Sequence, residues 1–384
     1  MKRAVVFLAM LAMVIILTAC SKPEVRKPSG EMDTARHHVE MGDRFAFKGD
    51  WESAHKEYQL ALQLDPKYVP ALVGEMVYFA QAGKQEEADA MREKAETNAK
   101  KDPDKFEYEL GLIRYYAYLG GKNWIENSEK AFKKALELNS NDERLYFYMA
   151  WAYKKALMFS EAEKYYQKVI EMNGSLRGAA DEEWKLCQKI VRARPGTPNG
   201  KKIALVTEIT RADVAALFVE EMHLPELWQK RGIKKWETPQ FMTPDQAARS
   251  GQQGPIMPTD IANHPLRSDI EAVIQLGIRG LEVAPDGKFY PDKKITRAEY
   301  AVMLEDILIK VLNEPQLATL YAGEAQSKFH DMRTEHWAYN AAVVVTSRQI
   351  MPADLEGNFH PMAPVAGVDA LLVIRQMMDY LKIG

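Results

Sequence analysis

The first half of the chain repeats one pattern of small and large residues with a period of 34 residues, and the third copy carries extra residues in its turn around Gly120-Gly121-Lys122. Ala54 and Ala88 are 34 residues apart, and so are Ser128 and Ala162. In each copy a larger residue follows four positions later and a small or aliphatic one follows after seven, so that all three share one face of an α-helix. The four copies are Ala54/Tyr58/Ala61, Ala88/Arg92/Ala95, Ser128/Phe132/Ala135 and Ala162/Tyr166/Val169.

Glycine-containing breaks divide each copy into two helices, at Gly49-Asp50, Ala82-Gly83 and Gly120-Gly121. One such hairpin cannot bury its apolar face alone, so the hairpins must stack into a solenoid. The spacing and residue types over residues 35–176 resemble tetratricopeptide repeats, and we expect about four of them. Residues 177–200 are then expected to supply a capping helix and, at 195–200, a linker.

The tetratricopeptide resemblance implies that the first helix of each hairpin lines a concave groove. An aromatic-lined groove of this kind can hold an extended peptide or a helix of a partner protein. The alternative is that the same side chains form the core of the repeats. The candidate groove residues are Tyr108, Leu112, Tyr115, Phe147 and Trp151.

A second internal repeat, with a period of 70 residues, follows in the C-terminal half. Residues 286–291 (Asp-Gly-Lys-Phe-Tyr-Pro) are matched by residues 356–361 (Glu-Gly-Asn-Phe-His-Pro), and an amphipathic helix is predicted after each. The first of these helices begins Ile-Thr-Arg-Ala-Glu at residues 295–299, and an earlier one begins Ile-Thr-Arg-Ala-Asp at residues 209–213. The spacing of Thr296 and Glu299 predicts a capping box.

The capping box does not explain Arg211 and Arg297, which stand in the first turn of these two helices. A cation there opposes the helix dipole, at a cost of roughly 0.3–1 kcal/mol. We therefore expect a compensating partner for each guanidinium. It is either an acid of the chain, such as Asp292 or Glu299, or a bound anion.

Together with Phe329-His330-Asp331 and His336-Trp337-Ala338, these motifs resemble S-layer homology domains over residues 201–384, with a long insertion at 224–258. The resemblance implies a helical module of three lobes whose grooves bind cell-wall polysaccharide, often through a pyruvate ketal. The glycan-binding candidates that it implies are Arg211, Arg297, Asp260, Asp331 and Trp337. An exposed Trp face also stacks well on sugar C–H groups.

Three departures from the S-layer homology pattern support an alternative, in which the module is degenerate and serves for packing or protein contact. Gly367 stands where the third helix start should carry arginine. In the middle repeat, residues 264–266 read His-Pro-Leu in place of His-Trp-Ala, and the first repeat has no Phe-x-Asp segment.

The first twenty residues predict export and lipid attachment. Lys2 and Arg3 precede an apolar run that is too short to cross a membrane comfortably, so residues 1–19 are interpreted as a signal peptide. Leu17-Thr18-Ala19-Cys20 resembles the lipobox of bacterial lipoproteins, which implies acylation of Cys20 and anchoring by its acyl chains. Residues 20–34 are expected to be a flexible tether.

This resemblance implies a location in the cell envelope. With Ser21 after the cysteine, the periplasmic side of the outer membrane is favoured in a two-membrane cell. In a one-membrane cell, the outer face of the cytoplasmic membrane is expected.

We expect a binding protein rather than an enzyme, with no cofactor and no bound metal. The sequence contains neither a phosphate-binding loop nor a nucleophile elbow, and no His or Cys pair has ligand spacing. A net charge of only −3 gives no reason to expect a nucleic-acid partner. The sequence thus predicts a lipid-anchored link between membrane and wall polysaccharide that also recruits an envelope protein or peptide. The alternative is an assembly scaffold in which both halves bind proteins and no glycan is recognised.

Overall fold

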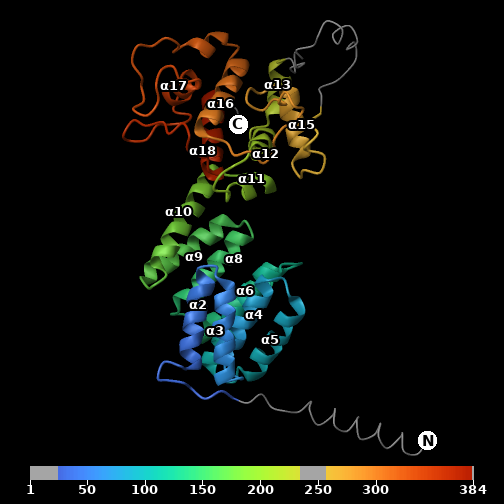
Figure 1. The fold of residues 1–384 in the computed structure, drawn as a ribbon, viewed down its shortest axis with the longest axis vertical. Coiled ribbons are helices and arrows are strands. Elements are labelled where there is room, and N and C mark those ends of the chain that lie inside the picture. The colour runs from blue at the N-terminus through green and yellow to red at the C-terminus, as the bar shows by residue number, and fades with distance from the viewer. Residues whose placement is uncertain (1–24, 234–256, 383–384) are drawn as a thin grey trace, which may run out of the picture. The chain divides into compact units, whose positions relative to one another are not determined.

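The computed structural model describes residues 25–233 and 257–382, which are mainly helical (Figure 1). Over these residues β-structure is limited to two isolated bridges, Thr210 with Lys294 and Thr296 with Pro364. The prediction of an all-α chain is therefore confirmed. The chain divides into two compact units, residues 1–187 and 188–384.

Several expectations fall partly or wholly outside the described residues. The expected signal peptide, Cys20 and residues 234–256 of the expected insertion are outside the described residues. In the two described ranges, no helix combines the length and the apolar character that crossing a membrane requires.

The first unit is built from helical hairpins whose first helices pack on one another in chain order. A further helix follows them, α10 (Arg177–Ala193), and the boundary between the units falls within it. The hairpins are α2 (Ala35–Phe47) with α3 (Trp51–Leu64), α4 (Val69–Gln81) with α5 (Gln85–Asn98), α6 (Asp102–Leu119) with α7 (Trp124–Leu138), and α8 (Glu143–Lys155) with α9 (Phe159–Met172).

The repeated small residues let the helices of the first unit approach closely, as the 34-residue pattern predicts. Ala54, Ala88 and Ala162 are fully buried. Tyr58 lies against Gly42 and Gly74, where an added Cβ would overlap its ring. Tyr58 thus fills the space between α2 and α4 that the two glycines leave open.

The expected tether is not free over residues 25–34. Arg26 forms two hydrogen bonds of 2.6 and 2.7 Å with the carboxylate of Asp33, and its backbone N–H donates to Gln63. The ring of His38 in α2 contacts both Asp33, at 2.9 Å, and Glu57, at 2.6 Å. These contacts attach the segment to the first hairpin.

The position of His38 predicts a pH dependence of this attachment. Burial of the ring lowers the pKa of His38, but the hydrogen bonds with Glu57 and Asp33 outweigh it and leave that pKa above its ordinary value. The resulting stabilisation is complete below the ordinary histidine pKa and is lost as pH rises through the higher, folded-state value. Amide exchange in α2, corrected for intrinsic rates, should therefore accelerate from pH 6 to pH 8. Replacing His38 by Gln should remove this pH dependence, and an unchanged dependence would contradict the assignment.

The second unit consists of short helices joined by long turns. Its helices are α11 (Pro198–Ile203), α12 (Arg211–Ala216), α13 (Leu224–Arg231), α15 (Arg267–Leu276), α16 (Arg297–Leu312), α17 (Tyr339–Ser347) and α18 (Gly367–Leu381). The π-helical turn η1 (Leu217–Glu221) continues α12, and the 3-10 turn η2 (Pro315–Thr319) follows α16. The predicted capping box of Thr296 with Glu299 is present, and Thr210 forms another with Asp213.

Three chain segments meet at the centre of this unit in a closed ring of backbone hydrogen bonds. Ile209 donates to Val365 at 2.9 Å, Val365 donates to Ile295 at 3.3 Å, and Ile295 donates to Ile209 at 3.0 Å. All three residues are buried, and each immediately precedes the N-cap residue of α12, α16 or α18. The unit is therefore an arrangement of three lobes around one central ring.

Residues 195–200, expected as a linker, are held within the second unit. The backbone N–H groups of Gly196 and Thr197 donate to the carboxylate of Glu221 at 3.0 and 2.9 Å. Arg375 of α18 binds the same carboxylate at 2.6 Å. Helix α11 begins at Pro198, so this segment is not an extended spacer.

The glycine at the third helix start has a steric cause. A Cβ at Gly367 would overlap the carbonyl oxygen of Ile203, the last residue of α11. Its backbone N–H donates to Val206 at 2.8 Å. Helix α11 thus occupies the space that an arginine side chain would need.

We expect Gly367→Ala to destabilise the second unit by about 3 kcal/mol or more, because the overlap is with backbone that cannot rotate away. Gly196→Ala is the matched control, since a Cβ there meets only Glu221, at 3.8 Å. Thermal unfolding of the full chain measures both. Equal melting temperatures for the two variants would be evidence against this packing.

Candidate functional site

Two aspartates hold the two related turns of the second unit. The carboxylate of Asp260 accepts from the backbone N–H groups of Phe289 and Tyr290, at 2.9 and 2.8 Å. That of Asp331 accepts from Phe359 and His360, at 2.8 and 2.7 Å. Because both oxygens of each carboxylate are engaged in the same way, Asp260 and Asp331 orient the two turns.

Each helix-start arginine reaches the turn of the following repeat. Arg211 donates from Nε to the carbonyl of Phe289 at 2.8 Å, and from its terminal nitrogens to Glu282 at 2.9 Å and to Gly280. Its guanidinium lies 4.5 Å from the centre of the Phe289 ring. The carbonyls and the ring face therefore provide the compensation that a cation at a helix start needs.

Arg297 repeats this arrangement one lobe further on. It donates from Nε to Phe359 at 2.8 Å and from a terminal nitrogen to Pro352 at 3.0 Å, with its guanidinium 5.0 Å from the Phe359 ring. Burial lowers the pKa of both arginines, and nearby carboxylates oppose that shift.

Asp292 and Glu299, the acids expected from the sequence, do not hold these guanidiniums. The compensating groups are backbone carbonyls of the chain, and neither arginine forms an ion pair with Asp292 or Glu299 within the described ranges. Each guanidinium therefore fastens one lobe to the next. Because three of the five N–H donors of Arg211 bind carbonyls, two are left for other contacts.

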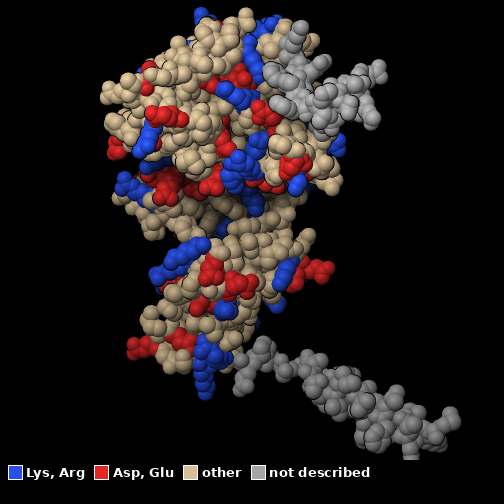
Figure 2. All heavy atoms as spheres, turned by 45° about the horizontal axis from the view of Figure 1, so that its top comes forward, with Lys and Arg blue, Asp and Glu red and all other residues tan. Residues whose placement is uncertain are grey.

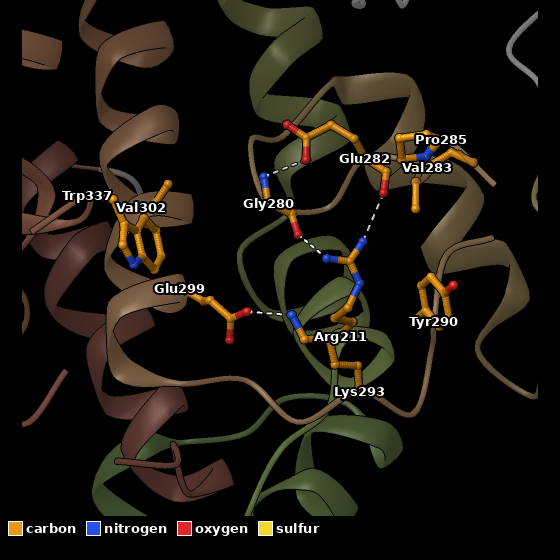
Figure 3. Close-up of a pocket in the computed structure, with 11 residues that line it drawn as sticks. Arg211, Gly280, Glu282, Val283, Pro285, Tyr290, Lys293, Glu299, Val302 and Trp337 are labelled. Atoms are coloured by element: carbon orange, nitrogen blue, oxygen red, sulfur yellow. Dashed lines mark hydrogen bonds and ion pairs between the residues drawn. The ribbon is translucent and has the colours of Figure 1, made fainter. Parts of the chain in front are cut away.

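A groove of about 660 Å³ opens beside Arg211 (Figure 3). Trp337 lies across the groove from Arg211, with 64% of its surface exposed. Between them, Lys293 and Glu299 form an ion pair at 2.7 Å. The groove is lined by Arg211, Gly280, Glu282, Val283, Ala284, Pro285, Tyr290, Lys293, Glu299, Val302 and Trp337.

Two of the glycan-binding residues expected from the sequence, Arg211 and Trp337, thus line the same groove. Arg297, Asp260 and Asp331 do not line it. Tyr290 and Lys293 were not identified as candidates. Their only sequence signal is their place just before a helix start, and it does not distinguish Lys293 from Lys294, whose Nζ donates to Glu208 instead.

The groove combines groups that suit a polar, neutral or weakly anionic ligand. It offers an apolar ring face, a phenol, two cationic side chains and two carboxylates. Charges of both signs are also intermixed over the face of the molecule seen in Figure 2, where neither sign forms a single large patch. Recognition at this site would therefore depend on local geometry rather than on a broad field.

The groove residues expected in the first unit are a different case, because four of the five are buried. Tyr108 and Phe147 are 7% exposed, Leu112 is 6% exposed and Tyr115 is 5% exposed. Only Trp151 is half-buried. Tyr115 donates to Asp89 of α5, so this side of α6 packs against the preceding hairpin instead of facing a partner. The expectation that these four residues line an open groove is therefore wrong.

The clamp formed by Arg297 predicts a local effect on stability. Arg297→Ala would leave the carbonyls of Phe359 and Pro352 without these donors, at a cost of about 1–3 kcal/mol. We expect faster exchange of the Phe359 and His360 amides. The exposed Arg333 is the control, since its side chain has no hydrogen bond or ion pair within the described ranges. If the Phe359 and His360 amides exchange at the same rate in Arg297→Ala and in Arg333→Ala, the clamp has no energetic role.

Comparison with known proteins gives two matches. Residues 259–301 match the S-layer homology domain. A 98-residue stretch is 30% identical to Cell surface glycoprotein 1 of Acetivibrio thermocellus. The aligned stretch covers 26% of this chain and 4% of that protein. The chain thus spans a small fraction of its relative's length. It carries an S-layer homology segment that includes Asp260, the turn at 286–291 and the start of α16.

Proposed function

We propose that this protein anchors itself to the cell wall by binding wall polysaccharide in the groove between Arg211 and Trp337. The observation that carries the proposal is the exposed indole of Trp337 facing the held guanidinium of Arg211 across that groove. The S-layer homology match over residues 259–301 supports it, as does the likeness to a protein named as a cell-surface glycoprotein.

The groove chemistry fits a sugar chain. A sugar ring presents C–H groups that stack on an indole face, while its hydroxyls need donors and acceptors around the rim. Lys293, Glu299 and Tyr290 supply both kinds of group. The two N–H groups of Arg211 that bind no carbonyl could also receive an acidic substituent, such as a pyruvate ketal.

In this proposal the protein is a lipid-anchored binding protein and not an enzyme. Acylation at Cys20, inferred from the lipobox-like Leu17-Thr18-Ala19-Cys20, would attach the N-terminus to a membrane. The second unit would bind the wall, and the first unit, whose repeats resemble tetratricopeptide repeats, would recruit an envelope protein. The location would be the cell envelope. The protein would be anchored to the periplasmic side of the outer membrane in a two-membrane cell, and to the outer face of the cytoplasmic membrane in a one-membrane cell.

A scaffold that binds only proteins is the second candidate. One observation favours it: Leu355 and Met362, on the turns of the third lobe, are exposed at 108% and 73%. Neither residue lines the Arg211 groove. Exposed apolar side chains of this kind are typical of protein contacts.

Sedimentation with isolated walls tests the proposal. We expect the full chain in detergent to pellet with walls and not with walls stripped of their attached polysaccharide. Trp337→Ala should weaken binding about tenfold, corresponding to ~1.4 kcal/mol, through loss of the stacking surface.

Leu320→Ala is the matched control, because Leu320 is 49% exposed but lies outside the groove. It should pellet like the unchanged chain. If Trp337→Ala also pellets normally while replacement of Leu355 and Met362 abolishes sedimentation, the scaffold function is favoured instead.

A further inference from the structure

A cation without a partner lies in the first unit, on helix α6. The Nε of Arg114 is shielded from water and has no hydrogen-bond partner. Over the described ranges, the side chain of Arg114 also forms no ion pair, and its contact is with the ring of Tyr148 of α8, whose centre is 4.3 Å from the guanidinium. A charged donor in this situation is costly unless something binds it.

The acid that acts on the pKa of Arg114 already accepts a hydrogen bond from another residue. Asp43 of α2 accepts a hydrogen bond from the hydroxyl of Tyr58 at 2.8 Å. Burial lowers the pKa of Arg114, but Tyr148 and Asp43 raise it further than burial lowers it. The guanidinium therefore stays charged while its donors remain unpaired.

A second cation lies on the same pair of helices. The Nζ of Lys155, in α8, is 4.5 Å from the ring centre of Tyr118 and 5.3 Å from that of Trp151. These two rings are themselves 4.9 Å apart. Lys155 forms no ion pair in the part of the chain that the structure describes, and burial lowers its pKa.

The two cations share one face because of their positions along neighbouring helices. Helices α6 and α8 pack together, and both are labelled in Figure 1. Tyr118 is one turn beyond Arg114 on α6, while Lys155 is two turns beyond Tyr148 on α8. At 1.5 Å per residue, the two cationic positions are roughly 10 Å apart along the helices.

We propose that Arg114, Tyr118, Tyr148, Trp151 and Lys155 form a binding face for an extended acidic peptide of a partner protein. This proposal rests on the recruiting role proposed above for the first unit and specifies the chemistry of the partner. A chain in the extended polyproline II conformation rises about 3.1 Å per residue with three residues per turn, so carboxylates three residues apart lie on one side and would reach both cations. The aromatic rings between them would contact the intervening side chains.

Charge complementarity favours a short acidic peptide over a polyanion. The two cations are isolated in a chain whose net charge is −3, so they cannot attract a nucleic acid by a long-range field. The carboxylates Asp43 and Glu107 lie close enough to act on the pKa of Tyr148, and they would repel a continuous polyanion. Two carboxylates on a peptide match the two unpaired donors instead.

A labelled peptide pair tests this face on the full chain in detergent. The probe is fluorescein-labelled Gly-Ala-Glu-Leu-Ala-Glu-Ala-Gly, and its partner carries Gln at both Glu positions. We expect the acidic peptide to bind at least about fivefold more tightly than the Gln peptide by fluorescence anisotropy. Arg114→Gln and Lys155→Gln should each remove most of this difference. Lys133→Gln, which changes an exposed lysine of α7, should leave it unchanged.

A stability measurement separates binding from a structural role. Because Arg114 makes no hydrogen bond, Arg114→Gln should leave the melting temperature unchanged or raise it. A clear fall would assign Arg114 to the core and overturn the proposal, as would equal binding of the two peptides. Displacement of the peptide by phosphatidylglycerol, added as mixed micelles with the same detergent, would overturn it in favour of a membrane surface.

The same variants distinguish this proposal from wall binding. Arg114→Gln should pellet with walls like the unchanged chain, and Trp337→Ala should still bind the acidic peptide. If the unchanged chain pellets with walls but binds the acidic and the Gln peptide equally, the peptide face is refuted and the wall-binding proposal stands.

Discussion

The ring of backbone hydrogen bonds among Ile209, Ile295 and Val365 fixes the geometry on which the second unit depends. Within the ring each segment donates once and accepts once, so the three segments hold one another in place. Because each ring residue immediately precedes an N-cap, the ring also sets where α12, α16 and α18 begin. It thereby places the first-turn residue of one lobe beside the turn of the next.

The arginines act as clamps because of that placement. A guanidinium in the first turn is unfavourable for its own helix, yet it becomes favourable when neighbouring carbonyls and a phenylalanine ring receive it. The same bonds hold Arg211 at one wall of the groove, opposite Trp337. A structural role and a binding role therefore coincide in this side chain, whereas Arg297 has only the clamping contacts within the described residues.

Arg114 differs from the arginines whose polar partners are described above. In the second unit Arg211 and Arg297 are bound by carbonyls, and Arg375 is bound by Glu221. In the first unit Arg114 rests on an aromatic ring with its donors unpaired. Because a protein rarely keeps such a charge without a compensating contact, the exception is more informative about binding than any of the satisfied arginines.

The sequence by itself determined the hairpins of the first unit and the start of α16. The 34-residue spacing of small residues predicted the hairpins, and the spacing of Thr296 and Glu299 predicted the capping box of α16, because both depend on contacts within one helix or hairpin. It could not assign the exposed face of α6. Tyr115 and Arg114 are adjacent in the chain, yet Tyr115 packs against α5 and Arg114 meets α8.

The sequence also could not identify the partners of Arg211, which are backbone carbonyls about 70 residues away and have no signature in side-chain type. The absence of arginine at Gly367 likewise follows only from the position of α11. Contacts between distant segments decided these points, because only packing shows which side chain finds a partner.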